Sequence, residues 1–146
     1  MTKEVLITIK GIQLIDGEES GIELMVTGNY YQKNGKHYIQ YEESVEGFQG
    51  TIKNMLKLTP YSLDMIKKGL TNTRMLFEKD KKTISAYSTP MGSMDLGIYT
   101  NRFEIEETKD FLKVDVGYAL DINYEHISDS RICVKVQSCG AAVEGK

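Results

Sequence analysis

The chain has 146 residues, of which 40% are hydrophobic and 27% are charged, and its formal net charge is −3. These values are typical of one ordinary soluble domain that is long enough to bury a sizeable core. The slight acidity argues against non-specific binding to nucleic acid or to an anionic membrane surface, so neither partner is expected.

The start of the chain shows no targeting signal. Residues Met1 to Glu4 lead directly into a strand pattern, without the apolar core of a signal peptide. No apolar run approaches the roughly 18 residues that a membrane span needs. We therefore expect a cytoplasmic protein, in which Cys133 and Cys139 are reduced thiols. The sequence does not decide whether Cys133 is reactive.

In the first part of the chain, apolar side chains recur at every second residue, which is the period of a β-strand. Strands are predicted over residues 3–13, 22–31, 36–43 and 51–58. Asp16-Gly17 marks a turn. Asn34-Gly35 is a stronger signal, because a two-residue type I′ hairpin needs positive φ at both positions.

The segment from Thr59 to Gly69 has two interpretations. Thr59-Pro60 is typical of a helix start, and Lys67-Lys68-Gly69 is typical of a helix end. The period of two on both sides favours a strand instead. The residues alone leave both alternatives open.

The second part of the chain continues the strand pattern. Residues 71–77 and 82–88 predict a hairpin around 79–81, and Pro90 predicts a turn or bulge over 89–92. A long strand over 92–107 is expected to bend at Gly97 or near Asn101. Strands over 112–122 and about 132–137 follow, joined by a polar connection from Tyr124 to Asp129.

Strands that arrive every 10 to 12 residues with short turns predict an all-β fold, a single antiparallel up-and-down β-barrel of about ten strands. The predicted barrel domain covers residues 1–139. Residues 140–146 carry no pattern and are expected to form a disordered tail.

One stretch resembles a known family. The sequence Thr89-Pro90-Met91-Gly92, followed by Gly97-Ile98-Tyr99-Thr100, is similar to a stretch of the YwiB-like family of uncharacterised bacterial calycin-like β-barrels. Residues 28–31 and 38–43 also match, although Met91 replaces the usual aromatic residue. The resemblance implies a barrel shaped like lipocalins and fatty-acid-binding proteins, with a strand over residues 61–68. It implies no catalytic residue, because the family has no established activity.

Motifs for catalysis and metal binding are missing from the sequence. There is no zinc-ligand spacing, serine elbow, phosphate loop or dinucleotide fingerprint. We therefore predict no catalytic residue, no metal site and no cofactor. His37 and His126 are expected at the solvated surface. Neighbouring carboxylates such as Glu42 and Glu43 point to opposite faces of a strand and are also expected there.

Four residues are the candidates for ligand binding in the barrel interior: Arg74, Arg102, Tyr38 and Tyr99. An inward guanidinium would need an anionic partner, which a ligand could supply. An outward orientation of both arginines is the simpler alternative. Methionines at strand positions 25, 55, 65, 75 and 94 are either core filler or the lining of a lipid-like cavity.

Three hypotheses on function remain open. The first is a binding module for a small, partly apolar or anionic ligand in the barrel interior. The second is a structural or interaction protein with a packed barrel, acting through its outer surface or as a homodimer. An enzyme is the weakest of the three, since it rests only on the general occurrence of polar groups at barrel mouths.

Overall fold

The computed structural model describes residues 1–15, 17–44, 47, 49–69, 72–89 and 91–139. Over these residues the chain forms ten strands: β1 (Glu4–Ile15), β2 (Glu18–Lys33), β3 (Lys36–Ser44), β4 (Thr51–Leu58), β5 (Ser62–Lys68), β6 (Asn72–Glu78), β7 (Lys82–Thr89), β8 (Gly92–Glu107), β9 (Phe111–Ile122) and β10 (Glu125–Ser138). The expected tail at 140–146, and Pro90 in the expected turn, lie outside the described residues.

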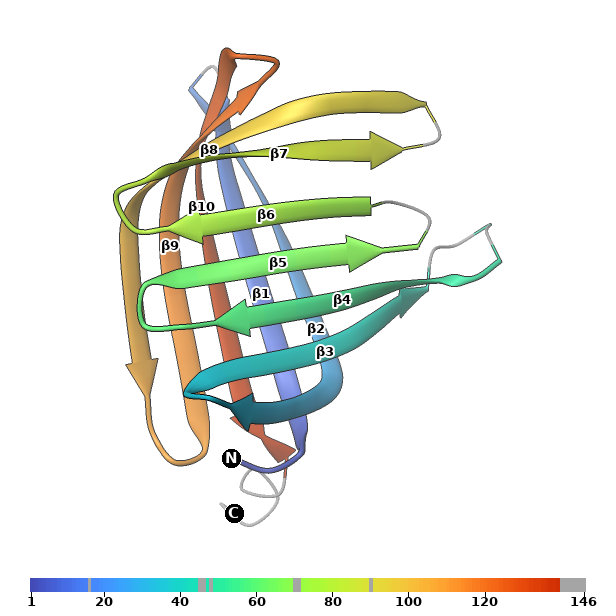
Figure 1. The fold of residues 1–146 in the computed structure, drawn as a ribbon, viewed down its shortest axis with the longest axis vertical. Helices are drawn as coiled ribbons and strands as arrows, with labels where there is room; N and C mark the ends of the chain where they lie inside the picture. Colours follow the sequence, from blue (N-terminus) through green and yellow to red (C-terminus); the bar gives the residue numbers. More distant parts are fainter. Residues whose placement is uncertain (16, 45–46, 48, 70–71, 90, 140–146) are drawn as a thin grey trace.

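Each strand pairs antiparallel with the next along the chain, and β1 pairs with β10, so the sheet closes into a barrel. This confirms the predicted all-β barrel of about ten strands. The barrel is flattened into two layers. In Figure 1, β9, β10, β1, most of β2 and the later part of β8 run along the long axis, and β3 to β7 run across them together with the start of β8. No helix in the described part of the chain is long and apolar enough to cross a membrane.

The core lies between these layers and explains the period of two. Val114 and Val116 of β9 are fully buried and belong to the same core cluster as Ile7 of β1, Leu56 of β4 and Phe77 of β6. Each such side chain contributes about 1.5–3 kcal/mol when removed from water. The alternating residues of the same strands point outward, and most of them are polar.

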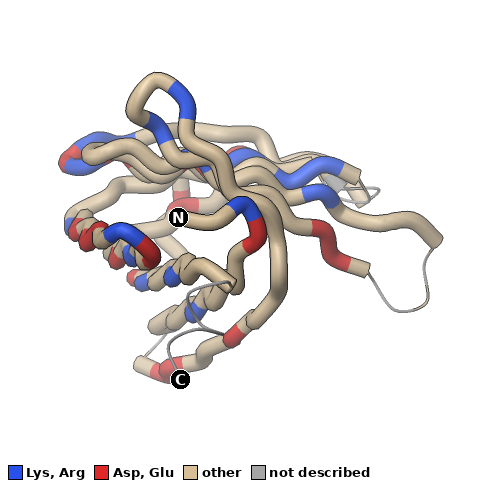
Figure 2. The backbone as a smooth tube through the Cα atoms, turned by 90° about the horizontal axis from the view of Figure 1, so that it is seen from below, with Lys and Arg blue, Asp and Glu red and all other residues tan. Residues whose placement is uncertain are grey.

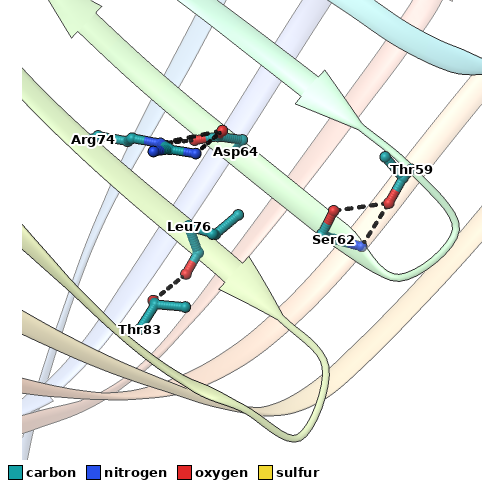
Figure 3. A network of polar contacts seen from close by, with 6 residues as sticks. All are labelled: Thr59, Ser62, Asp64, Arg74, Leu76 and Thr83. Carbon is teal, nitrogen blue, oxygen red and sulfur yellow. Dashed lines mark hydrogen bonds and ion pairs between the residues drawn. The ribbon is translucent and has the colours of Figure 1, made fainter.

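The ambiguous segment forms a strand. The Thr59 hydroxyl accepts a hydrogen bond of 3.0 Å from the Ser62 backbone N–H (Figure 3). The Thr59 N–H donates to the Ser62 carbonyl over 2.9 Å. These bonds close a tight turn around Pro60 instead of starting a helix. Beyond the turn, Leu63 is buried inside, and Asp64 binds Arg74 on the outer face.

The predicted polar connection from Tyr124 to Asp129 is wrong. A two-residue turn of Asn123 and Tyr124, both with positive φ, joins β9 to β10, which begins at Glu125. The strand lacks apolar alternation here because its inward residues are Ser128 and Ser130. Their hydroxyls are 3.0 Å apart and satisfy each other, so burial costs little. The pairing of β8 with β9 shifts register between Thr100 and Arg102. This irregularity confirms the expected break in β8 near Asn101.

β2 belongs to both layers. Its residues up to Asn29 pair with β1, whereas only Asn29 to Lys33 pair with β3. The strand crosses between the layers at Gly28, where its backbone closely approaches the backbone of β3 at Gln40. A Cβ atom at Gly28 would lie 2.3 Å from the Gln40 carbonyl oxygen and 2.7 Å from Cδ1 of Ile7. A glycine is therefore required there by close approach.

We predict that Gly28→Ala lowers the free energy of unfolding by about 3 kcal/mol, because the new methyl group meets a backbone carbonyl that cannot move aside. Gly11→Ala is the matched control, since its Cβ would meet nothing nearer than Cγ1 of Ile22 at 3.6 Å. Urea denaturation of both variants measures the difference. Equal stability of the two would contradict the role given to Gly28.

Candidate functional site

Five inward side chains form a row across β3 to β7. Direct cross-strand pairing links Tyr41 to Asn54, Asn54 to Lys67, Lys67 to Thr73 and Thr73 to Tyr87. Directly paired residues on one face have Cβ atoms about 4.5–5.5 Å apart. The polar row is therefore continuous, and it borders the apolar core.

An ion pair lies in the middle of this row. Nζ of Lys67 is 3.2 Å from Oε1 of Glu43, and Nδ2 of Asn54 donates a hydrogen bond of 2.8 Å to the same oxygen. Burial, and secondarily the Glu43 carboxylate, raise the pKa of Tyr41. The Tyr41 hydroxyl thus stays protonated at neutral pH and can donate a hydrogen bond.

The Thr73 hydroxyl is the unusual group of the row. Thr73 is only 8% exposed, and its oxygen has no hydrogen-bond partner among the described residues. A buried polar group without a partner costs about 1–3 kcal/mol. A polar atom of a bound molecule could offset this cost.

Several inward apolar side chains near the row remain partly exposed. They share the face of the buried core residues but are reached by solvent: Leu24, Val26, Met65, Met75 and Met94. Solvent therefore enters this end of the barrel interior. Met25 and Met55 lie on the outer face instead.

An open cleft of about 880 Å³ lies where β2 diverges from β3. Its lining includes three residues that face inward, Val26, Tyr41 and Asn54, so the cleft adjoins the polar row. Outward residues of β3, β4 and β5 also line it: Gln40, Glu42, Lys53, Met55, Ile66 and Lys68. The volume lies within the range of small-molecule sites, about 300–1,000 Å³.

The structure places the four predicted ligand-binding residues on the outer face. Arg74 makes two-pronged hydrogen bonds with Asp64, the shortest 2.8 Å long (Figure 3). Tyr38 stacks on Tyr31, with ring centroids 4.8 Å apart, and Tyr99 is 43% exposed. The prediction that these four residues line the interior is therefore wrong, and a role of these residues in ligand binding stays a prediction.

Arg102, the fourth predicted residue, belongs to a charged cluster on the outer face. It donates to Glu104 over 3.1 Å and lies 4.0 Å from Asp115. Arg131 binds both oxygens of Asp115, at 2.8 and 2.6 Å. The arginines are thus neutralised by carboxylates of their own chain, without a ligand.

The prediction that His37 is solvated is wrong. It is 5% exposed and faces inward, because the register of β3 places it in line with Ile39 and Tyr41. Its Nδ1 is 2.6 Å from the Tyr30 hydroxyl, and its Nε2 is 3.2 Å from Oε1 of Glu107. This network joins β2, β3 and β8 away from the polar row. His126 is exposed, as expected.

Sequence reasoning missed the polar row because its members resemble surface residues. Glu43 was expected on the surface, and Lys67 was grouped with a helix end. One signal was present: Lys67 continues the inward positions of Leu63 and Met65, so a charge falls in an apolar series.

Comparison with known proteins agrees with this architecture. The model of the family described as "Domain of unknown function (DUF1934)" matches residues 7–134. The chain therefore belongs to the DUF1934 family. It is 25% identical to the "Uncharacterized beta-barrel protein YwiB" of Bacillus subtilis (strain 168), over 90% of this chain and 94% of that protein. The resemblance to YwiB-like proteins is thus confirmed.

A solved structure of YwiB from Bacillus subtilis superimposes with a TM-score of 0.80 and 20% sequence identity, covering 93% of this chain and 92% of that one. At this identity the likeness shows the barrel fold. Function has to be argued from the side chains of this chain.

The outer charged cluster generates a prediction on pH. Hydrogen bonds from Arg131 hold the pKa of Asp115 below its usual value. The ionised carboxylate therefore stabilises the native state above about pH 4, and this contribution disappears as the pH falls through the lower native pKa. Asp115→Asn should cost about 1 kcal/mol at pH 7, a modest value because Arg131 is half exposed.

Urea denaturation at about pH 7 and about pH 3 measures this loss. The difference between wild type and Asp115→Asn should shrink at the lower pH. Glu104→Gln is the control, since its carboxylate is largely exposed. A loss of the same size at both pH values would contradict the assignment.

Proposed function

We propose that the chain is a binding module for a small amphipathic molecule at the open end of the barrel. The apolar body of this ligand lies against the partly exposed inward side chains, and its polar or anionic head lies on the row around Lys67. The observation that carries the proposal is the buried Thr73 hydroxyl, which has no hydrogen-bond partner among the described residues and lies directly beside the Lys67–Glu43 ion pair.

The row offers a complementary set of groups for an acidic head. The Lys67 ammonium supplies charge, and the Tyr41, Asn54 and Thr73 side chains supply hydrogen-bond donors. The Glu43 carboxylate occupies Lys67 in the free protein, at 3.2 Å. An anionic ligand therefore has to displace Glu43 from Lys67. The free energy needed for this displacement lowers the affinity of the protein for the ligand.

The apolar part of the site suits a flexible chain better than a rigid ring system. Three of its inward residues are methionines, whose unbranched side chains adapt to irregular shapes. Lys and Arg alternate with Asp and Glu around the barrel (Figure 2). Recognition then depends on the local row rather than on a long-range field of one sign.

The alternative, a packed barrel that acts only through its outer surface, has less support. A packed interior would leave inward methionines and leucines inaccessible, whereas solvent reaches Leu24, Met65 and Met75. The binding hypothesis is also the one that gives a reason for the unpartnered hydroxyl of Thr73.

A pair of fluorescent probes tests the proposal: dansyl-aminoundecanoic acid and its methyl ester, which share an apolar chain but differ in the anionic head. Lys67→Met should weaken binding of the acid about tenfold, equivalent to about 1.4 kcal/mol, and leave the ester unchanged. Glu43→Gln should strengthen binding of the acid, because it removes the competitor for Lys67.

Lys57→Met is the matched control, since Lys57 of β4 points to the outer face and is not among the residues that line the cleft. It should leave the affinity of both probes unchanged. Equal effects of the two lysine variants, or no binding of either probe to the wild type, would refute the proposal.

Thr73→Val separates binding from stability. Replacing the unpartnered hydroxyl by a methyl group of the same shape removes a desolvation cost, so the free energy of unfolding should stay equal or rise by up to about 1 kcal/mol. Probe affinity should fall at the same time. A variant that loses stability would show that the hydroxyl already has a partner within the protein.

A further inference from the structure

One edge of β2 is unpaired over a long stretch. From Glu18 to Gly28 the strand pairs with β1 on one side, and the pairs with β3 on the other side begin only at Asn29. In Figure 1, β2 follows β1 behind while β3 runs across in front, so the two strands diverge. Within the described ranges, no other strand pairs with this edge.

Backbone N–H and C=O groups on such an edge are a template for another strand. The side chains of this stretch are also unusually open to solvent for apolar residues. Ile22 is 78% exposed and Met25 is 64% exposed. This stretch is the longest unpaired edge among the described strands; β8 also lacks a partner on one edge, but only from Asn101 to Glu107.

We propose that this edge binds the same edge of a second copy of the chain, so that the two barrels share one continuous antiparallel sheet about a two-fold axis. Such an interface is isologous, with each residue pairing with a fixed partner in the other copy. The inference does not depend on ligand binding, because it uses the backbone edge of β2 and Ile22, and none of the residues of the polar row.

The register follows from the faces of the strand. In a continuous sheet, inward residues pair with inward residues, so the axis must pass through a residue and not between two. An axis at Ile22 pairs Ile22 with its own copy. Glu18 then pairs with Val26, Glu19 with Met25, and Gly21 with Glu23.

The glutamates of β2 select this register over its neighbours. If the register shifts by two residues so that the axis lies at Glu23, Glu23 pairs with its own copy. If the register shifts by two residues in the other direction, so that the axis lies at Gly21, Glu19 pairs with Glu23. Like charges directly opposite each other are destabilising. The axis at Ile22 avoids both clashes and buries the most exposed apolar side chain of the strand.

The charges at the two ends of the edge are complementary. With the axis at Ile22, Glu18 of one copy lies beside Val26 of the other, and Glu19 lies beside Met25. Val26 lines the cleft that also contains Lys53, Lys68 and Glu42. Glu18 at the start of each strand therefore meets a cleft whose charged lining residues, two lysines and one glutamate, carry a net positive charge, at both ends of the interface.

Sedimentation of the purified chain over a range of concentrations tests the proposal. The small contact of a single strand edge predicts a dimer with a dissociation constant of about 10–100 µM. Ile22→Lys places two like charges at the axis and should leave only monomer. Ile84→Lys is the control, because Ile84 is an exposed apolar residue of β7, 57% accessible, away from this edge.

A charge exchange tests the pairing itself. Glu18→Lys with Glu19→Lys should be monomeric, and Lys53→Glu with Lys68→Glu should be monomeric as well. An equimolar mixture of the two variants should restore the dimer, because opposite charges then meet at both ends. Restoration in the mixture also excludes misfolding as the cause of the monomeric state.

A cross-link measures the register. In a background with Cys133→Ser and Cys139→Ser, Ile22→Cys should form an intermolecular disulfide on oxidation, since residues at the axis face each other closely enough. Thr27→Cys should not. A wild-type chain that stays monomeric up to about 1 mM, or cross-linking at residue 27 instead of 22, would overturn the proposal.

Discussion

The contact of the Gly28 backbone with the Gln40 carbonyl is the constraint on which the rest of the structure depends. It lets one strand serve both layers of the barrel, since β2 pairs with β1 before this point and with β3 after it. Without a glycine the backbones could not approach, and the two layers would lose their closure on this side. The same crossing leaves β2 and β3 diverging, and the cleft, the open end of the interior and the unpaired strand edge all lie at this divergence.

Polarity changes in layers along the barrel interior. Leu58, Leu63 and Phe77 pair across β4, β5 and β6 in a layer that is almost completely buried. Two layers further along the same strands, the paired residues are Asn54, Lys67 and Thr73. Burying Lys67 in the first layer would cost several kcal/mol, even with a partner. At the open end, where its side chain is 37% exposed, Lys67 keeps part of its hydration and can exchange partners.

The alternation of apolar residues predicted the strands and their closure, because both follow from a period that is visible along the chain. It did not predict which face of each strand is inside. Asp64 with Arg74 and Glu43 with Lys67 are chemically alike, but the first pair is outside and the second is inside. The two pairs differ only in whether their residues fall on the odd or the even positions of their strands. The neighbours Met65 and Ile66 show that both faces of β5 carry apolar residues. The irregularity between Thr100 and Arg102 changes parity within one strand, which no local pattern signals.

The two proposed roles, ligand binding and dimerisation, use groups of β2 that point in perpendicular directions. Side chains of β2 leave the sheet on its two faces, so Leu24 and Val26 are available to a ligand inside the barrel. Backbone groups lie in the plane of the sheet, so they are available to a neighbouring strand. A second copy on the edge therefore does not require the interior site to be empty. Substitutions at Lys67 and Thr73 act on the first role, and substitutions at Ile22 act on the second, because these side chains belong to different layers of the barrel.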